Sequence, residues 1–335
     1  DYTPAIFRKT YAEGYLNLVR TLPELWGYMY SQSDQKAQRS WEKNLRILFN
    51  RLNTIEFFRF MDRLNPQGIV CTHFMPLELL SHRKEQETLG PLLYGVLTDF
   101  AVHSLWICSQ VDGYYVATDE ARRALIRKGQ PERRVRVTGI PVDAAFSQTA
   151  SQAALRKKHG LDPALPTLLI LSGGFGVGPT ERLLNAFKDS PFKCQLVDIT
   201  GKNAELKRKA EAAARHLTIP VKVIGYTPAI HEFMEASDLV ITKPGGLTSA
   251  ETLARNKPMM ILDPIPGQEQ RNAEYLLENG VAVRLFEIED APWKAKQVLE
   301  DPERLSRMVK NARRIARPNA AFEIVRDILL RTPAR

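Results

Sequence analysis

Short apolar runs alternate with amphipathic stretches along most of this chain, and each run leads into a loop and then into a segment with helical spacing. Strands buried in a parallel sheet read as such runs, because helices cover both faces of the sheet. The pattern therefore predicts an α/β fold. The predicted strands lie at residues 69–72, 93–98, 113–117, 135–138, 167–171, 195–199, 221–224, 239–242 and 259–262.

Two domains are expected, because a chain of 335 residues exceeds the usual size of one domain. The alternation is broken at residues 139–143, and a small, polar stretch follows at residues 147–154. We therefore expect the first domain to cover residues 1–146 and the second to begin at residue 147.

The chain is basic, with a formal net charge of +9 and a pI of about 9.4. Such a charge favours an anionic partner, namely a nucleic acid, a nucleotide or an acidic lipid surface, although solvated helix faces would account for any single basic cluster. No apolar run reaches the ~18–20 residues that cross a bilayer. The most apolar stretch, residues 91–108, is interrupted by Asp99 and His103, so we expect no membrane span.

Cysteine and histidine spacing argues against metal and disulfide sites. Cys71, Cys108 and Cys194 are far apart and form no CxxC pair, which excludes a disulfide framework and fits a reducing cytosol. The histidines form no HExxH cluster, and no D-x-D triplet occurs. We therefore expect a protein that works without a metal.

The N-terminal stretch, residues 1–60, carries aromatic and leucine side chains at helical spacing with basic residues between them. Such a stretch either lies in a membrane interface or packs against the sheet. Trp26 is the best interfacial candidate. The apolar stripe comprises Tyr11, Tyr15, Leu18, Leu22, Leu25, Trp26, Tyr30 and Trp41.

Two glycine-rich loops follow predicted strands of the second domain. Residues 171–179 contain Gly174 and end in Pro179, which suits the first position of a helix; the loop either contacts a phosphate or is only a tight turn. Residues 243–251 read KPGGLTSAE. In one interpretation Thr248 and Glu251 form a capping box.

In the other interpretation, Gly245 and Gly246 at the start of the helix hold a diphosphate, and Glu251 accepts hydrogen bonds from ribose hydroxyls. The two interpretations compete for the same carboxylate oxygens.

A third loop, residues 263–272, is dense in amide and carboxylate groups, which suit sugar hydroxyls because a hydroxyl both donates and accepts. The alternative is the polar first turn of a helix that continues to Glu278. Gly225 and Tyr226 directly follow the predicted strand at 221–224 and could hold a base by backbone contacts and stacking. Together these loops predict a nucleotide-sugar ligand.

Residues 242–251, followed by residues 265–269, resemble the monogalactosyldiacylglycerol synthase and diacylglycerol glucosyltransferase family. The resemblance covers nearly the whole chain; in the first half it rests on residues 94–100, 115–118 and 137–142 with His103 and Trp106. It implies a GT-B fold, in which two Rossmann-like domains face each other across a cleft. In that fold the second domain would end at residue 318, and a helix within residues 319–335 would pack back on the first domain.

The resemblance also implies roles for individual residues. Glu251 would bind ribose, Gln268 and Glu269 the donor hexose, and residues 245–249 the diphosphate. The expected donor set comprises Gly174, Tyr226, Lys243, Gly245, Gly246, Leu247, Thr248, Ser249, Glu251, Gln268, Glu269 and Asn272. The expected acceptor side comprises Asp99, His103, Trp106 and His73.

The implied reaction is the inverting transfer of a hexose from UDP-galactose or UDP-glucose to diacylglycerol, with no cofactor besides this co-substrate. Backbone N–H groups would meet the charge on the leaving UDP, assisted by Lys243 or Arg271. His103 and Asp99 are the candidate bases, although both would also suit a structural polar loop, and Asp99 could instead orient a histidine. Family members normally begin with a strand and a glycine-rich loop ending in histidine, so we expect the first domain to be truncated.

The expected partners are the UDP-sugar, diacylglycerol and an anionic membrane surface, with no nucleic acid. The expected location is peripheral, on the cytoplasmic face of the cell membrane. Two other functions stay open: a UDP-N-acetylglucosamine-using GT-B enzyme, either an epimerase or a lipid-linked transferase, and a non-catalytic nucleotide-sugar sensor.

Overall fold

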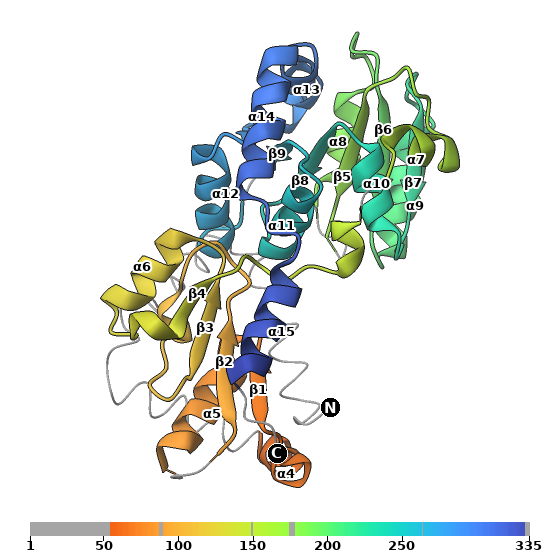
Figure 1. The fold of residues 1–335 in the computed structure, drawn as a ribbon. Helices are drawn as coiled ribbons and strands as arrows, with labels where there is room; N and C mark the ends of the chain where they lie inside the picture. Colours follow the sequence, from red (N-terminus) through yellow and green to blue (C-terminus); the bar gives the residue numbers. More distant parts are fainter. Residues whose placement is uncertain (1–53, 87–89, 149, 174–177, 263, 332–335) are drawn as a thin grey trace. The chain divides into compact units, whose positions relative to one another are not determined.

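The computed structural model describes residues 54–86, 90–148, 150–173, 178–262 and 264–331. The N-terminal aromatic stripe with Trp26, and Gly174 of the first glycine loop, lie outside these residues. Contacts divide the chain into two units (Figure 1). The first unit comprises Asp1–Ile140, Ile265–Arg271 and Phe322–Arg335, and the second comprises Pro141–Pro264 and Asn272–Ala321. The domain limits derived from the sequence stay a prediction.

The first unit contains a parallel sheet of four strands in the order β1-β2-β3-β4. One face packs on α5 and α6 through a core that includes Leu77, Tyr114 and Leu125. On the other face, Tyr94 and Tyr115 pack against α15. The strands are β1 (Gly68–Cys71), β2 (Leu92–Val96), β3 (Gly113–Val116) and β4 (Val135–Val137). The helices are α4 (Ile55–Leu64), α5 (Phe74–Gln86), η1 (Ser104–Trp106), α6 (Asp119–Arg127), η2 (Glu132–Arg134) and α15 (Ala320–Arg331).

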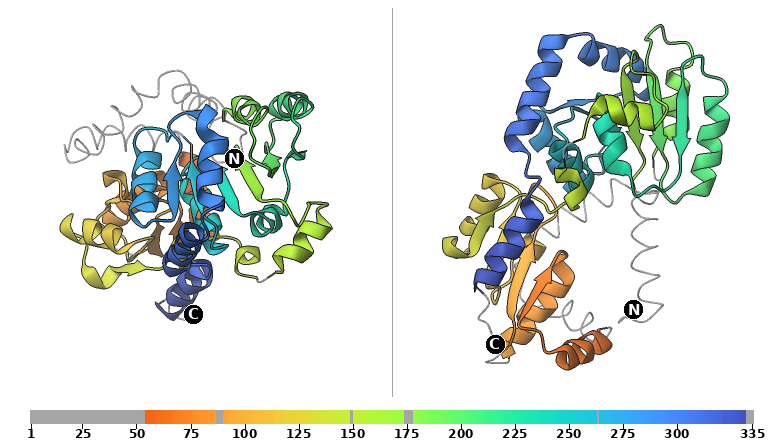
Figure 2. Two further views of the ribbon diagram at one scale, coloured as in Figure 1. Left: turned by 90° about the horizontal axis from the view of Figure 1, so that it is seen from above. Right: turned by 45° about the vertical axis from the view of Figure 1, so that its right-hand side comes forward.

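The second unit contains a parallel sheet of six strands in the order β10-β9-β8-β5-β6-β7, with helices on both sides (Figure 2). One core joins the sheet to α8, α9, α13 and α14, and another joins it to α7, α10 and α11. The strands are β5 (Thr167–Leu171), β6 (Gln195–Ile199), β7 (Val221–Ile224), β8 (Leu239–Thr242), β9 (Met259–Ile261) and β10 (Ala282–Arg284).

The helices of the second unit are η3 (Ala144–Ser147), α7 (Gln152–Lys158), α8 (Thr180–Ala186), α9 (Ala204–Ala214), α10 (Ile230–Ala236), α11 (Gly246–Ala254), α12 (Gln268–Glu278), η4 (Ile288–Asp290), α13 (Ala291–Leu299) and α14 (Pro302–Ile315). Of these, α12 begins within Ile265–Arg271, a segment that belongs to the first unit.

Every apolar run singled out in the sequence forms a strand, so the α/β prediction is confirmed. The sequence analysis missed β10, because this edge strand has three residues and ends in an arginine. The order of the second sheet also shows where a ligand is to be sought. From β5 the chain proceeds to β6 and β7 on one side and then returns to β8 on the other, and ligands of parallel sheets bind at the carboxyl ends of strands where the order reverses.

Candidate active site

The turn after β8 starts α11 without a side-chain cap. Gly245 occupies the N-cap position, and the described part of the chain provides no side-chain cap there. A Cβ atom added at Gly245 would meet no atom of the described residues within 4 Å, so these residues leave the space beside the turn open. The first N–H groups of a helix lack partners within the helix, and together with the helix dipole they attract anions.

The capping box expected at Thr248–Glu251 is therefore wrong. Gly245 takes the cap position, so Thr248 lies inside the helix and Glu251 lies in its second turn. A T-x-x-E pattern identifies a cap only where no earlier residue starts the helix. The Glu251 carboxyl group is consequently not engaged with the backbone of its own helix.

Glu251 is partly buried, and no hydrogen bond joins it to the residues that the structure describes. Burial raises its pKa to about 7, and the nearby Asp143 carboxylate contributes to that rise. The Glu251 carboxyl group therefore takes up a proton more readily than an exposed glutamate does. A protonated carboxyl group donates one hydrogen bond and accepts others, and it carries no charge that would repel an anion nearby.

The remaining residues of the turn differ in their access to a ligand. Lys243 and Thr248 are partly exposed, and Leu247 is 52% exposed. Ser249 is fully buried, its backbone N–H donates to Gly245 (2.9 Å), and its hydroxyl has no hydrogen-bond partner in the described part of the chain. The burial of Ser249 argues against the predicted contact with a diphosphate.

The loops after β6 and β7 place an aromatic ring and a cation together. Tyr226 is 65% exposed, and the Lys202 ammonium lies 5.3 Å from the centre of its ring. The structure thus keeps the expected ring of Tyr226 accessible, and it adds Lys202, which the sequence analysis missed. The signal for Lys202 was its position just after the strand at 195–199.

The first unit contains the predicted hexose residue Gln268 together with the candidate base Asp99. The Gln268 amide Nε2 donates to Asp99 Oδ2 at 2.7 Å. Glu269 closes its own loop, since its Oε2 accepts from the Ile265 N–H at 2.9 Å. Arg271 Nη1 donates to the Val102 carbonyl at 3.3 Å. Residues 265–271 are therefore tied to the carboxyl end of β2.

Asn272, the last residue of the expected donor set, is fully buried in α12. Its side chain has no surface for a sugar, so the structure does not support direct contact with the hexose.

The histidines at this edge are oriented by backbone N–H groups. His103 is 4% exposed and its Nδ1 accepts from the Leu105 N–H at 3.2 Å. His73, exposed after β1, accepts from the Met75 N–H through Nδ1 at 3.2 Å. Since Nδ1 uses its lone pair in each ring, the neutral ring carries its proton on Nε2 and acts there as a donor. This arrangement favours Asp99 over His103 as a base.

Trp106 belongs to the core of the first unit rather than to an acceptor surface. Its side chain is 4% exposed and its ring lies 6.4 Å from that of Phe74, edge to face. Its carbonyl accepts from the Tyr114 hydroxyl at 2.9 Å. The expectation that Trp106 lines the acceptor side is corrected accordingly, because a buried indole offers no surface to a lipid.

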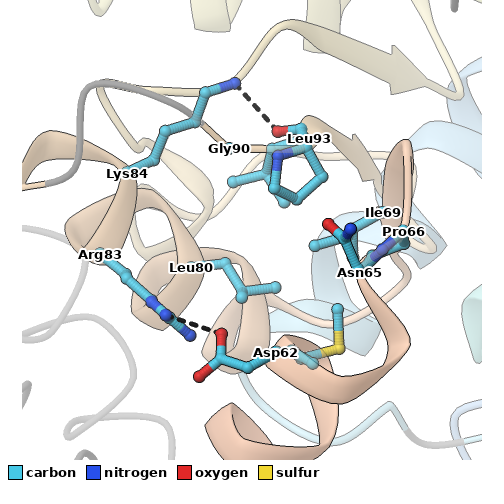
Figure 3. A pocket seen from close by; sticks show the side chains of 11 residues that line it. Asp62, Asn65, Pro66, Ile69, Leu80, Arg83, Lys84, Gly90 and Leu93 are labelled. Carbon is cyan, nitrogen blue, oxygen red and sulfur yellow. Dashed lines mark hydrogen bonds and ion pairs between the residues drawn. The ribbon is translucent and has the colours of Figure 1, made fainter.

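A cavity of about 220 Å³ lies at the amino ends of β1 and β2, away from the carboxyl edge of the same sheet (Figure 3). Its two basic side chains are already neutralised. Arg83 pairs with Asp62 at 2.7 Å, and Lys84 pairs with Asp112 at 2.5 Å and donates to the Pro91 carbonyl at 3.2 Å. We therefore do not assign an anionic ligand to this cavity.

Two absences hold for the residues that the structure describes. Among them, no three or more histidine, cysteine, aspartate or glutamate side chains gather so as to hold a metal ion. No helix in this part of the chain has the length and hydropathy that crossing a membrane requires.

Comparison with known proteins adds two family matches. Residues 1–142 match the family described as Monogalactosyldiacylglycerol (MGDG) synthase, and residues 151–315 match Glycosyl transferases group 1. A processive diacylglycerol beta-glucosyltransferase of Bacillus subtilis is 35% identical over 88% of this chain and 76% of its own length.

Two solved structures share the fold. MurG of Acinetobacter baumannii superposes with a TM-score of 0.61 at 17% identity, over 84% of this chain and 78% of that chain. The UDP-GlcNAc 2-epimerase of Neisseria meningitidis superposes with a TM-score of 0.61 at 16% identity, over 82% of this chain and 79% of that chain. These neighbours confirm the GT-B fold class that the sequence predicts.

Proposed function

Since the chain belongs to the family of diacylglycerol glucosyltransferases, we propose that it transfers a hexose from a UDP-sugar to the free hydroxyl group of diacylglycerol. The observation that carries the proposal is the start of α11. There an uncapped helix end faces open space next to a carboxyl group that has no bonding partner in the described residues. Because the relatives are named for glucose, glucose is the proposed sugar.

The second unit holds the nucleotide. The N–H groups at the start of α11 bind the diphosphate, Glu251 binds the ribose hydroxyls, and the exposed ring of Tyr226 supports the base. When the bond to the anomeric carbon breaks, negative charge develops on the leaving UDP. Preorganised N–H groups and the positive end of the helix dipole stabilise that charge without a metal, and Lys243 adds to the effect.

The first unit supplies the base. Asp99 accepts the proton of the diacylglycerol hydroxyl as its oxygen attacks the anomeric carbon, and the reaction proceeds with inversion. The bond from Gln268 holds one carboxylate oxygen of Asp99 in place (2.7 Å). A positioned general base of this kind typically contributes about 10²–10⁴-fold to the rate.

The test is an incubation of the protein with diacylglycerol liposomes and either UDP-glucose or UDP-galactose, each labelled in the hexose. The expected product is a labelled glycolipid from UDP-glucose, with the β anomer showing inversion. Asp99→Asn should lower the rate of transfer by at least about 100-fold while UDP-glucose still binds. Conversion of the nucleotide sugar without lipid, or its binding with no glycolipid formed, would contradict the proposal in favour of an epimerase or a sensor.

We further propose that the protein is peripheral and docks on an anionic bilayer through α15. This helix has two apolar faces: Ile324 packs on the first sheet, while the opposite face is exposed around Arg326. Apolar side chains that are exposed together on one helix face suit the interface of a bilayer, especially beside a basic residue. The exposed apolar residues are Phe322 (60%), Val325 (54%), Leu329 (67%) and Leu330 (80%).

A basic protein gains about 1 kcal/mol for each lysine or arginine near an anionic bilayer, and diacylglycerol is a lipid of the bilayer. The three cysteines are free and buried, which fits the cytoplasmic side of the membrane. In liposome sedimentation, the double variant Leu329→Ser/Leu330→Ser should lose most of the binding. Phe286→Ser, which removes an exposed apolar side chain (74%) of the second unit, should retain it. Binding that ignores lipid charge, salt and the α15 variant would contradict this proposal.

A further inference from the structure

The inner face of α15 is bonded to the first sheet through a buried tyrosine (Figure 1). The Tyr115 hydroxyl of β3 donates to Asp327 Oδ2 at 2.8 Å, and Arg331 Nε lies 2.8 Å from the same oxygen. Tyr115 is 1% exposed, so its hydroxyl group is shielded from water. Asp327 and Arg331 are partly buried. Two polar contacts therefore connect the strand, the carboxylate and the last turn of the helix.

The apolar part of the same interface is small. Its buried members are Tyr94, Val96, Tyr115 and Ile324, and Leu92 and Ile328 are partly buried beside them. Of this cluster, α15 supplies Ile324 and Ile328. The helix thus offers the sheet two isoleucine side chains.

The outer face of α15 offers more apolar surface than the inner face. Residues three, four or seven positions apart lie on one side of a helix. The outer face carries Phe322, Val325, Leu329 and Leu330, which are 54–80% exposed. Hydrophobic stabilisation grows with the apolar area that is removed from water. Apolar burial alone would therefore favour a helix turned about its own axis, with this face against the sheet.

The hydrogen bond from Tyr115 opposes that rotation. A helix turned with Leu329 against the sheet would carry Asp327 away and leave the Tyr115 hydroxyl buried without this acceptor. Leaving a buried polar group unpaired is more unfavourable than the loss of an exposed hydrogen bond. The pair of Asp327 with Arg331 would survive the rotation, because both residues belong to the helix. Of the two contacts, the bond to Tyr115 is the one that distinguishes the orientations.

We propose that Tyr115 and Asp327 are positioning residues that set the rotation of α15 about its axis, so that its apolar face points outward to an anionic lipid bilayer. The inference rests on the proposed docking of α15. Arg326 is exposed among the apolar side chains, and the chain has a net charge of +9, which suits anionic lipid. Without the bond the helix turns and buries the face that enters the bilayer.

The first measurement of the test needs no lipid. The three native cysteines are buried, so a cysteine placed on α15 is the accessible site for a thiol reagent. Leu329→Cys should react fast and Ile324→Cys slowly, because the two native side chains are 67% and 4% exposed. When Tyr115→Phe is added, the ratio of the two rates should fall by at least about tenfold, the factor that one hydrogen bond to a charged group provides.

The second measurement is sedimentation with vesicles of phosphatidylcholine and phosphatidylglycerol that contain diacylglycerol. Tyr115→Phe should lower the bound fraction several-fold, and Asp327→Ala, which breaks the same bond from the helix side, should do likewise. Glu323→Ala is the matched control, because it removes an equal charge from an exposed position of the same helix. It should bind the vesicles at least as well as the wild type.

The outcomes are distinguishable. If the wild type does not bind the vesicles although Tyr115→Phe changes the ratio of rates, docking on the bilayer fails while the positioning of the helix stands. If the wild type binds but Tyr115→Phe and Asp327→Ala leave the ratio unchanged, the positioning role is refuted while docking stands. An equal loss of binding in Glu323→Ala would also refute it. Thermal unfolding of each variant establishes that it is folded.

Discussion

The polar side chains at the carboxyl edges of the two sheets differ in their hydrogen bonding. In the first unit they are bonded to the protein: Asp99 to Gln268, Glu269 to the Ile265 N–H and His103 to the Leu105 N–H. In the second unit, Glu251 has no bond to the described residues and α11 starts without a side-chain cap. The first edge is thus preorganised, whereas the second leaves its polar groups for a ligand.

The second unit also holds an unpaired carboxyl group in its interior. Asp198 lies in β6 opposite Ile170 of β5 and Val223 of β7, is fully buried, and has no partner for either oxygen in the described part of the chain. Burial raises its pKa to about 7. Together with Glu251 it gives the second unit two carboxyl groups whose pKa is raised to about 7.

The largest effect is expected from Asp198→Asn. The folded-state pKa of about 7 exceeds the unfolded value of 3.8, so folding favours the protonated form and stability falls as the pH rises from about 4 through 7. The wild type should lose up to about 4 kcal/mol of unfolding free energy over this range from this one group. Urea unfolding across the pH range should show that Asp198→Asn removes the loss.

The matched control is Asp189→Asn, an exposed aspartate of the same unit, which should keep the wild-type pH dependence. An Asp198→Asn protein with an unchanged pH dependence would mean that the Asp198 carboxyl group is not held in its protonated form.

Next in size is Glu251→Ala. Loss of the bonds to ribose should weaken UDP-glucose binding by about 2 kcal/mol, or roughly 30-fold. The unfolding free energy should not fall, because the variant removes a desolvated carboxyl group that caps nothing. Calorimetry and thermal unfolding measure the two quantities. The control is Glu287→Ala, which removes an exposed glutamate of the same unit and should change neither the affinity nor the unfolding free energy. If the two variants bind UDP-glucose with equal affinity, Glu251 is not part of the nucleotide site.

A smaller effect is expected at the carboxyl edge of the first sheet, where the polar side chains are hydrogen-bonded to the protein. Gln268→Ala removes the bond that holds Asp99, and transfer to diacylglycerol should slow by about tenfold, since one hydrogen bond to a charged group contributes about 1.5 kcal/mol. The affinity for UDP should change little. Gln297→Ala, an exposed glutamine of α13, serves as control. A normal rate of transfer in Gln268→Ala would show that preorganisation of the first edge is not needed.

The smallest effect is expected for Thr248→Ala. A true capping threonine contributes about 1 kcal/mol to stability, but here Gly245 starts the helix. The unfolding free energy should therefore change by less than about 0.5 kcal/mol. A fall of about 1 kcal/mol in the unfolding free energy would support the capping box instead. The Glu251 carboxyl group would then be bonded to its own helix rather than to the ligand.

The sequence predicted the parts of the fold that repeat a local pattern. Buried parallel strands appear as apolar runs, so both sheets were found, except for the short edge strand β10. The capping box failed because T-x-x-E is a local pattern, and the residue that actually starts the helix stands three positions before Thr248. The prediction that Trp106 lines the acceptor side was wrong because the sequence does not distinguish a loop residue that is buried in the core from one that faces a ligand.

The pairing of groups could not be predicted at all. Gln268 and Asp99 are 169 positions apart, and nothing local indicates that they share a hydrogen bond. The same holds for the burial of Asp198 within an otherwise apolar strand. The order of the strands in each sheet decides which of these residues come close to one another. The spacing of residues along the chain does not reveal that order.

The nucleotide is expected to lie at the start of α11, and a crystal structure of the protein with UDP tests this position most directly. The expected result is a ribose hydroxyl about 2.7–3.1 Å from a Glu251 carboxyl oxygen, with the diphosphate on the N–H groups of residues 246–248. A nucleotide bound at another place, or bound here with Glu251 turned away from the ribose, would contradict the account.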